Sequence, residues 1–176
     1  MKHLKLFEDF NHSIITLYHG TYSPIESFDK IKDKLFLSTS LQFSTDYGEN
    51  LYKVKIKPEK VFDSTDIKNQ MKLKDDINKI NQIPLGDKLK EKDRNYFCDM
   101  VKSAIVSYPN TWYWVERLLD NQGEYFGFGF DYFTEQGYEA ILITEWETVN
   151  YIIWDESVIY DFKFLGKRKD LMNRFI

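Results

Sequence analysis

LYHGT (residues 17–21), KLFLSTS (34–40) and STDYG (44–48) are the stretches that decide the fold of this chain. The first two end apolar, β-branched or aromatic runs at turn-forming residues, which predicts two short strands, Ile14–His19 and Leu35–Leu37. Ser40 is a suitable N-cap for a helix that runs through Tyr47 and stops at Gly48. We therefore expect two strand ends and one short helix to present a His-Gly step, a Ser/Thr cluster and a tyrosine.

The segment Leu51–Pro58 is the clearest strand of the sequence. Its strict alternation puts Tyr52, Val54 and Ile56 on one face and three lysines and Leu51 on the other, so one face is expected to be buried. Strand patterns return late in the chain, at 138–143, 149–154 and 158–164. Between them, residues 63–133 carry apolar residues at helical spacing. This order predicts an α+β fold with an antiparallel or mixed sheet and an inserted helical block at 66–133, within a single domain of residues 1–176.

The composition restricts the class of protein. The chain has 176 residues, of which 43% are hydrophobic, so there is ample material for a core. Cys98 is the single cysteine, which excludes an intrachain disulfide and a cysteine-based metal site, and no metal is expected. No apolar run reaches the ~20 residues of a membrane span, and the first ten residues lack the features of a secretory signal. A cytoplasmic location is expected. A net charge of −4 disfavours non-specific nucleic-acid binding.

The His-Gly step, the strand aromatic and the Ser-x-x-Tyr helix together resemble the NAD-binding half of the ADP-ribosyltransferase superfamily, in its diphtheria-toxin and poly(ADP-ribose)-polymerase branch with the His-Tyr-Glu signature. The resemblance covers residues 15–65 and 136–165. Taken singly, each of these side chains is as readily a structural residue. The resemblance implies NAD as substrate, held by the following residues: His19 on the adenosine-side ribose, the Gly20 backbone and Ser44 on the nicotinamide carboxamide, Phe36 and Tyr47 against the nicotinamide ring, with Thr21 and Ser38 beside them.

The third part of the signature departs from the family. The resembling strand begins with a catalytic glutamate, whereas this chain has Asn150 in NYIIWD (150–155). A carboxylate about 4 Å from a developing cation is worth roughly 4 kcal/mol at an effective dielectric near 20, or about a thousandfold in rate. Glu147 lies three residues earlier, in a Glu-Trp-Glu sequence that resembles the Glu-x-Glu turn of the toxin-like branch. On a regular strand Glu147 and Asn150 would face opposite sides, so Glu147 needs a turn or bulge at Thr148 to reach the site.

The resemblance implies a mono-ADP-ribosyltransferase with His19, Tyr47, Glu147 and Asn150 as catalytic residues, acting on a protein acceptor or, as the second option, a nucleic acid. Two alternatives stay open: an NAD glycohydrolase, and a catalytically silent NAD-fold binding or inhibitor protein. Phosphotransfer to RNA is disfavoured, because no basic phosphate site accompanies His19. The opening LKLFEDF (4–10) resembles leaders of tailed-phage proteins, which implies packaging into a phage capsid as a further expectation.

Overall fold

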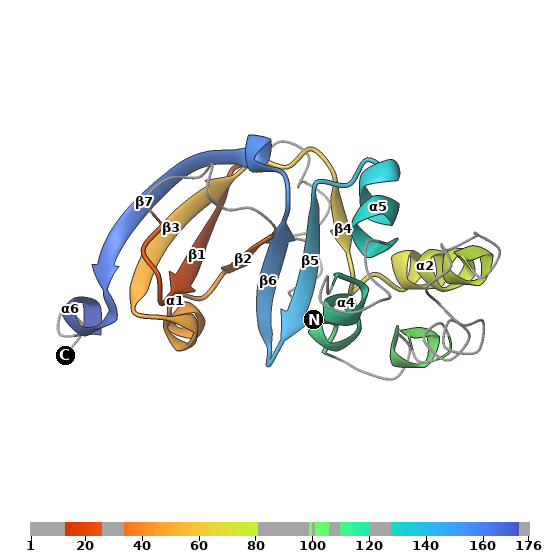
Figure 1. Cartoon of the computed structure of the whole chain (residues 1–176), viewed down its shortest axis with the longest axis horizontal. Helices are drawn as coiled ribbons and strands as arrows, with labels where there is room; N and C mark the ends of the chain where they lie inside the picture. The colour runs from red at the N-terminus through yellow and green to blue at the C-terminus, as the bar shows by residue number, and fades with distance from the viewer. Residues whose placement is uncertain are drawn as a thin grey trace. The chain divides into compact units, whose positions relative to one another are not determined.

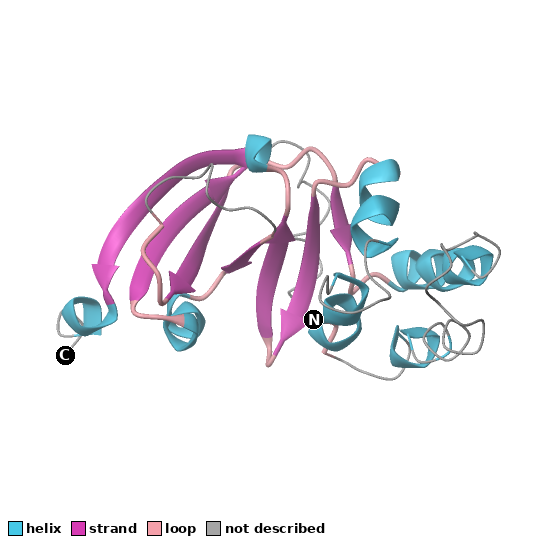
Figure 2. Cartoon of the chain, in the orientation of Figure 1, coloured by secondary structure: helices cyan, strands magenta, loops and turns pink. Residues whose placement is uncertain are grey.

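The computed structural model describes residues 13–25, 34–80, 99, 101–105, 110–119 and 128–172. The leader-like segment at 4–10 lies outside them. Strands and helices both contribute, as Figure 2 shows. The seven strands of the described residues are β1 (Ile15–Thr21), β2 (Leu35–Ser38), β3 (Asn50–Ile56), β4 (Val61–Asp63), β5 (Ala140–Glu145), β6 (Thr148–Ile153) and β7 (Ile159–Lys167).

These strands hydrogen-bond in the order β4-β5-β6-β2-β1-β3-β7 (Figure 1). The pairs β1–β2, β1–β3, β2–β6 and β3–β7 are antiparallel. β4 and β5 run parallel, because the Glu139 amide donates to the Lys60 carbonyl and the Ser64 amide donates to the Leu142 carbonyl, so both residue numbers rise together. A parallel pair needs a long crossover, and residues 64–139 supply it. The α+β fold with a mixed sheet is thereby confirmed.

The helical segments with described bounds are α1 (Leu41–Ser44), the 3₁₀ turn η2 (Thr45–Tyr47), α2 (Ile67–Ile80), α4 (Trp112–Leu119), α5 (Phe128–Glu135), η3 (Glu156–Val158) and α6 (Arg168–Met172). Residues 101–105 are helical as well. The sequence pattern predicted the helix after Ser40, and the Ser40 side chain does cap it by accepting from the Phe43 amide. The pattern missed β4 and α6, because three to five residues are too few for a periodicity to show.

The chain divides into two compact units. The first comprises residues 1–61, 138–141 and 148–176, and the second comprises 62–137 and 142–147. In the first unit, the alternation predicted for β3 is confirmed: Tyr52, Val54 and Ile56 are buried, whereas Lys53 and Lys55 are partly exposed. Leu51, on the lysine face of β3, is also fully buried, so the predicted alternation does not extend to it. The core is completed by fully buried apolar side chains from other strands, among them Leu17, Leu37 and Ile152.

The second unit has its own core, in which the Phe62 and Phe133 rings lie 4.8 Å apart. Trp114 of α4 is fully buried there, Trp112 is half-buried and Tyr113 is exposed, which assigns Trp114 to the core and removes it from any docking surface. The apolar residues at helical spacing, from which the sequence predicted helices between residues 66 and 133, are those of amphipathic helices. The described residues contain no helix of the length and apolarity that a membrane span requires.

Candidate functional site

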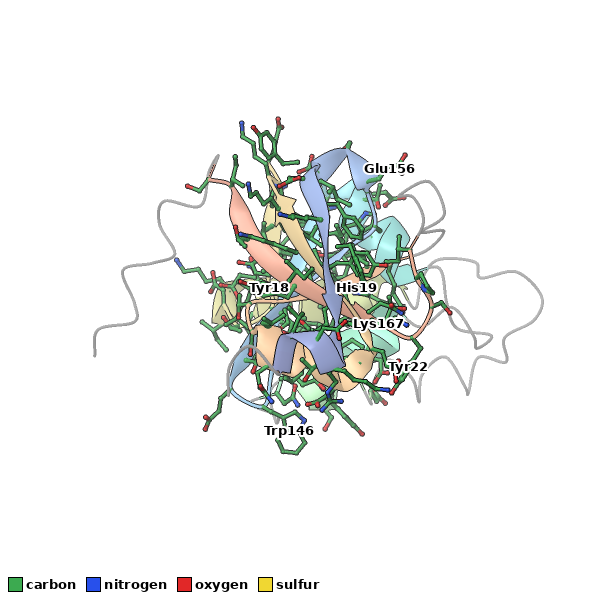
Figure 3. The ribbon with its side chains drawn as sticks, turned by 90° about the vertical axis from the view of Figure 1, so that its left-hand side faces the viewer. Tyr18, His19, Tyr22, Trp146, Glu156 and Lys167 are labelled. Carbon is green, nitrogen blue, oxygen red and sulfur yellow. The ribbon has the colours of Figure 1, made fainter. Side chains whose placement is uncertain are left out.

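The His19–Gly20 step lies near the end of β1 in the first unit, where Figure 3 labels His19. The His19 Nδ1 atom is 2.7 Å from the Phe36 carbonyl oxygen on β2. A carbonyl only accepts, so Nδ1 carries the proton and Nε2 keeps a free lone pair. Burial lowers the pKa of His19, and the smaller opposing effect of the bond to Phe36 does not offset it. His19 is therefore a neutral imidazole at pH 7, able to accept a hydrogen bond at Nε2.

The same hydrogen bond fills a gap between two strands. β1 and β2 are paired in register at Tyr18 and Ser38, and the next side chain along β1, His19, reaches the β2 backbone where a ladder bond would otherwise stand. On its other side β1 stays paired with β3 over seven residues, including His19 with Tyr52. The sheet thus loosens on the β2 side of the His-Gly step.

Gly20 is required by a close backbone approach. A Cβ atom placed there would lie 1.9 Å from the Ser44 carbonyl oxygen at the end of α1, a distance at which no side chain fits. The absence of a side chain lets α1 and η2 pack directly on β1. Gly48, where η2 ends, meets the Thr21 backbone in the same way. The glycines therefore fix the short helix against the strand that carries His19.

Ser44 and Tyr47, which the resemblance assigns to the nicotinamide, differ in exposure. Ser44 is buried and its hydroxyl donates to the Ser40 carbonyl, whereas Tyr47 is 46% exposed with its ring 5.3 Å from that of Phe43. The difference lies in what each side chain meets: α1 ends at Ser44, whose hydroxyl bonds back to Ser40, and Tyr47 ends the 3₁₀ turn η2 beside Phe43. Tyr47 keeps an accessible ring, and Ser44 serves the local backbone.

Asn150 is the most unusual polar residue of the unit. It lies on β6 opposite Ser38 of β2, and Ser38 is in turn opposite Tyr18 of β1, so the three side chains share one face of the sheet. Asn150 is 1% exposed, and neither its Oδ1 nor its Nδ2 atom has a hydrogen-bond partner in the described structure. Ser38 is also buried, and its Oγ accepts from the Ser40 amide. Buried side-chain amides are normally paired, so Asn150 has unused hydrogen-bonding capacity.

Two polar residues that the sequence reasoning missed hold the loop after β1. The Nδ2 atom of buried Asn50 donates to the carbonyls of Thr21 and Tyr22, at 3.2 and 3.0 Å. The hydroxyl of buried Tyr52 accepts from the Ile25 amide at 2.9 Å. The alternation had placed Tyr52 in the core, but nothing in the sequence indicated which backbone groups these side chains would reach. Two residues predicted to contact NAD are half-buried: Thr21 at the end of β1, and Phe36 on β2.

Glu147 belongs to the second unit, and the prediction that it enters the site with His19 stays a prediction. It is exposed in a two-residue turn between β5 and β6, where Trp146 and Glu147 have φ of +47° and +67°. The expected turn lies one residue earlier than Thr148, which already begins β6. Glu147 is therefore not on the strand of Asn150, so the argument from opposite strand faces does not apply. Glu145, the other acidic residue of this sequence, is buried at the end of β5.

Among the residues that the structure describes, no group of three or more His, Cys, Asp or Glu side chains is placed to hold a metal ion. No protein-family model and no curated protein sequence matches the chain. One solved structure is similar in part, the crystal structure of an anti-CRISPR protein, with a TM-score of 0.44 and 11% sequence identity over 88% of this chain and 98% of that one.

Proposed function

We propose that this protein binds NAD and transfers ADP-ribose to a macromolecular acceptor, as a mono-ADP-ribosyltransferase. The observation that supports this most is the strand order β6-β2-β1 in the first unit. It makes neighbours of the strands that carry Asn150, Ser38 and His19, and Gly20 packs against the helix that leads to Tyr47. These residues are the separate parts of the ADP-ribosyltransferase resemblance. The loosening between β1 and β2 is in keeping with the split sheet of that fold. His19 follows Tyr18 on β1 and so lies on the opposite face of the sheet from Asn150 and Ser38, which means that the proposal needs NAD to cross the loosened boundary between β1 and β2.

Each residue has a chemical role in this proposal. The Nε2 lone pair of neutral His19 accepts from a ribose hydroxyl, and the accessible ring of Tyr47 stacks on nicotinamide. The carboxamide of Asn150 supplies a donor and an acceptor for the nicotinamide-side ribose. The remaining contacts with NAD are proposed to come from Gly20, Thr21, Phe36, Ser38 and Ser44.

The reaction breaks the bond between ribose C1′ and the nicotinamide nitrogen, and the bonding electrons leave with neutral nicotinamide. Positive charge then builds on the ribose, and an acceptor nucleophile bonds to C1′ and loses its proton. In the proposal Glu147 supplies the negative charge that stabilises this transition state, since Asn150 is neutral. A protein side chain is the first choice of acceptor, and a nucleic acid the second.

The proposed setting is the cytoplasm of a host cell, with delivery in a phage capsid as an extension that rests on the sequence at 4–10 alone.

A silent NAD-binding protein is the second candidate, and one observation favours it. The residues that follow Asn150 across the sheet on the same face are Ser38, Tyr18, Lys53 and Lys163, and none is a carboxylate. A site on this row of side chains alone would bind the substrate without a carboxylate to stabilise the cation. An NAD glycohydrolase, the third candidate, would release nicotinamide and leave no label on an acceptor.

The experiment incubates the protein with NAD labelled in the adenosine half and a host-cell lysate, and measures both transferred label and free nicotinamide. We expect Glu147→Gln to lower turnover by roughly two to three powers of ten while NAD affinity stays unchanged, because one electrostatic stabiliser is lost. Glu59→Gln, which neutralises another exposed carboxylate, is the matched control and should be fully active.

Asn150→Glu places a charge where the resembling family has one and should raise turnover. Full activity of Glu147→Gln would refute its role. If neither wild type nor Asn150→Glu transfers label or releases nicotinamide, the silent-binder assignment replaces the enzyme.

A further inference from the structure

β7 forms an edge of the sheet in the first unit. It pairs with β3 and ends the strand order, and it is nine residues long. Figure 1 shows it at the left-hand edge of the sheet, and Figure 3 looks onto that edge. One side of an edge strand presents unpaired N–H and C=O groups, and a long edge is a template for another strand.

One face of β7 is aromatic and only partly covered. Tyr52 of β3 stacks on Phe162 with ring centroids 4.8 Å apart and lies 5.2 Å from Phe164. This stack stops at the edge, where Phe164 is 50% exposed and Tyr160 is 64% exposed. Phe162 and Phe164 pair with Val54 and Tyr52 of β3 and so belong to one face, whereas Tyr160 lies at a register shift between Asp161 and Ile159. Apolar area thus stands beside unpaired backbone.

The other face of β7 carries Lys163, whose positive charge has no acidic partner within the described residues of the chain. Lys163 lies directly opposite Lys53 of β3, and like charges in that position destabilise a sheet. Asp161, two residues away on the same face, is opposite Lys55 and forms an ion pair with it at 3.3 Å. In the part of the chain that the structure describes, Lys163 has no carboxylate within ion-pair distance.

We infer that β7 pairs antiparallel with β7 of a second copy of this chain, about a two-fold axis that passes through Phe162 perpendicular to the sheet. In this register Asp161 of each copy faces Lys163 of the other, twice by symmetry. Phe162 of each copy lies beside Phe162 of the other at the axis, which extends the aromatic stack across the interface. The lysine that opposes Lys53 within one chain gains a carboxylate from its partner.

The charges select this register over its neighbours. A two-residue shift that centres the axis on Lys163 sets that lysine against its own copy, and a shift that centres it on Asp161 sets two carboxylates opposite each other. Odd shifts would place residues of opposite faces against each other. The pairing joins two sheets edge to edge and does not depend on NAD. A failed test of the dimer would therefore leave the proposed activity untouched, and the reverse also holds.

The test measures molar mass in solution by light scattering or sedimentation, on the full chain. Wild type should have twice the mass of one chain. Asp161→Lys sets two lysines against each other, and Lys163→Asp sets two aspartates against each other, so each variant alone should be monomeric. Mixing the two variants restores opposite charges at both contacts and should give a heterodimer. Glu59→Lys, the same change of charge away from β7, should leave the wild-type dimer intact.

A wild type that is monomeric throughout its soluble concentration range would overturn the inference. So would a dimer that survives both Asp161→Lys and Lys163→Asp, because it would use another surface. If the single variants are folded by circular dichroism and monomeric but do not associate when mixed, this register is wrong.

Discussion

Replacing Asn150 by leucine should stabilise the protein, which is the opposite of what a buried polar-to-apolar change does when the polar group is paired. Leucine has the same number of non-hydrogen atoms as asparagine and removes a carboxamide whose two polar atoms have no hydrogen-bond partner in the described structure. Burying such a group without compensation costs about 1–3 kcal/mol. Asn150→Leu should therefore raise the free energy of unfolding by about 1–3 kcal/mol, less whatever the extra hydrogens cost in packing.

Asn50→Leu is the matched control on β3. Asn50 is 5% exposed, but its Nδ2 atom donates to two carbonyls in the loop after β1. Two hydrogen bonds at about 0.5–1.5 kcal/mol each predict a loss of about 1–3 kcal/mol. The same substitution at two buried asparagines in one sheet should thus act with opposite sign.

Thermal melting followed by circular dichroism measures both effects. For a chain of this size 1 kcal/mol shifts Tm by about 2–4 °C, so Asn150→Leu should raise Tm by about 2–12 °C and Asn50→Leu should lower it by a similar amount. Asn150→Leu should also weaken NAD binding, since it removes a proposed ribose contact. If Asn150→Leu destabilises the fold as much as Asn50→Leu does, the carboxamide is paired in solution and the reasoning is refuted.

Three further predictions rest on separate features. Gly20→Ala should destabilise the fold by about 3 kcal/mol, because a Cβ would stand 1.9 Å from the Ser44 carbonyl oxygen; a Tm within error of wild type would contradict the packing of α1 on β1. Burial lowers the pKa of His19 below its ordinary value of 6.5, so the stability that neutral His19 contributes is complete above pH 6.5 and is lost as the pH falls toward the folded-state pKa. His19→Gln should flatten the pH dependence of the free energy of unfolding below pH 6.5, and an unchanged slope would show that His19 does not titrate there. Trp146→Asn should stabilise the turn between β5 and β6 by about 1 kcal/mol, because asparagine tolerates the positive φ of +47° that tryptophan disfavours; a loss of stability in urea unfolding would mean that the indole is held by contacts outside the turn.

The sequence predicted the elements best where one simple rule controlled them. The alternation of β3 placed Tyr52, Val54 and Ile56 correctly, because one buried face leaves a period of two. The Ser40 cap located the helix that follows β2, because the capping hydrogen bond is local.

The site was harder to predict, because its geometry depends on contacts between distant segments. The three-residue spacing of Ser44 and Tyr47 did not indicate that Ser44 would be buried against its own helix backbone while Tyr47 stays exposed. The pairing of Asn150 with Ser38 is set by the register of β2 and β6, which no local pattern encodes. The turn that carries Glu147 has two residues of unfavourable turn propensity, so only the resemblance of Glu-Trp-Glu to the Glu-x-Glu turn pointed to it.

The most direct test of the central claim is a calorimetric titration of NAD into wild type, His19→Ala and Tyr47→Ala, with Tyr22→Ala as the control for an exposed aromatic residue. We expect wild type and Tyr22→Ala to bind with equal affinity. His19→Ala and Tyr47→Ala should each bind at least about tenfold more weakly, since a lost hydrogen bond or stacking contact of about 1.4 kcal/mol corresponds to that factor. Absence of NAD binding by wild type, or unchanged affinity in both His19→Ala and Tyr47→Ala, would contradict an NAD site at the His-Gly step and the neighbouring helix.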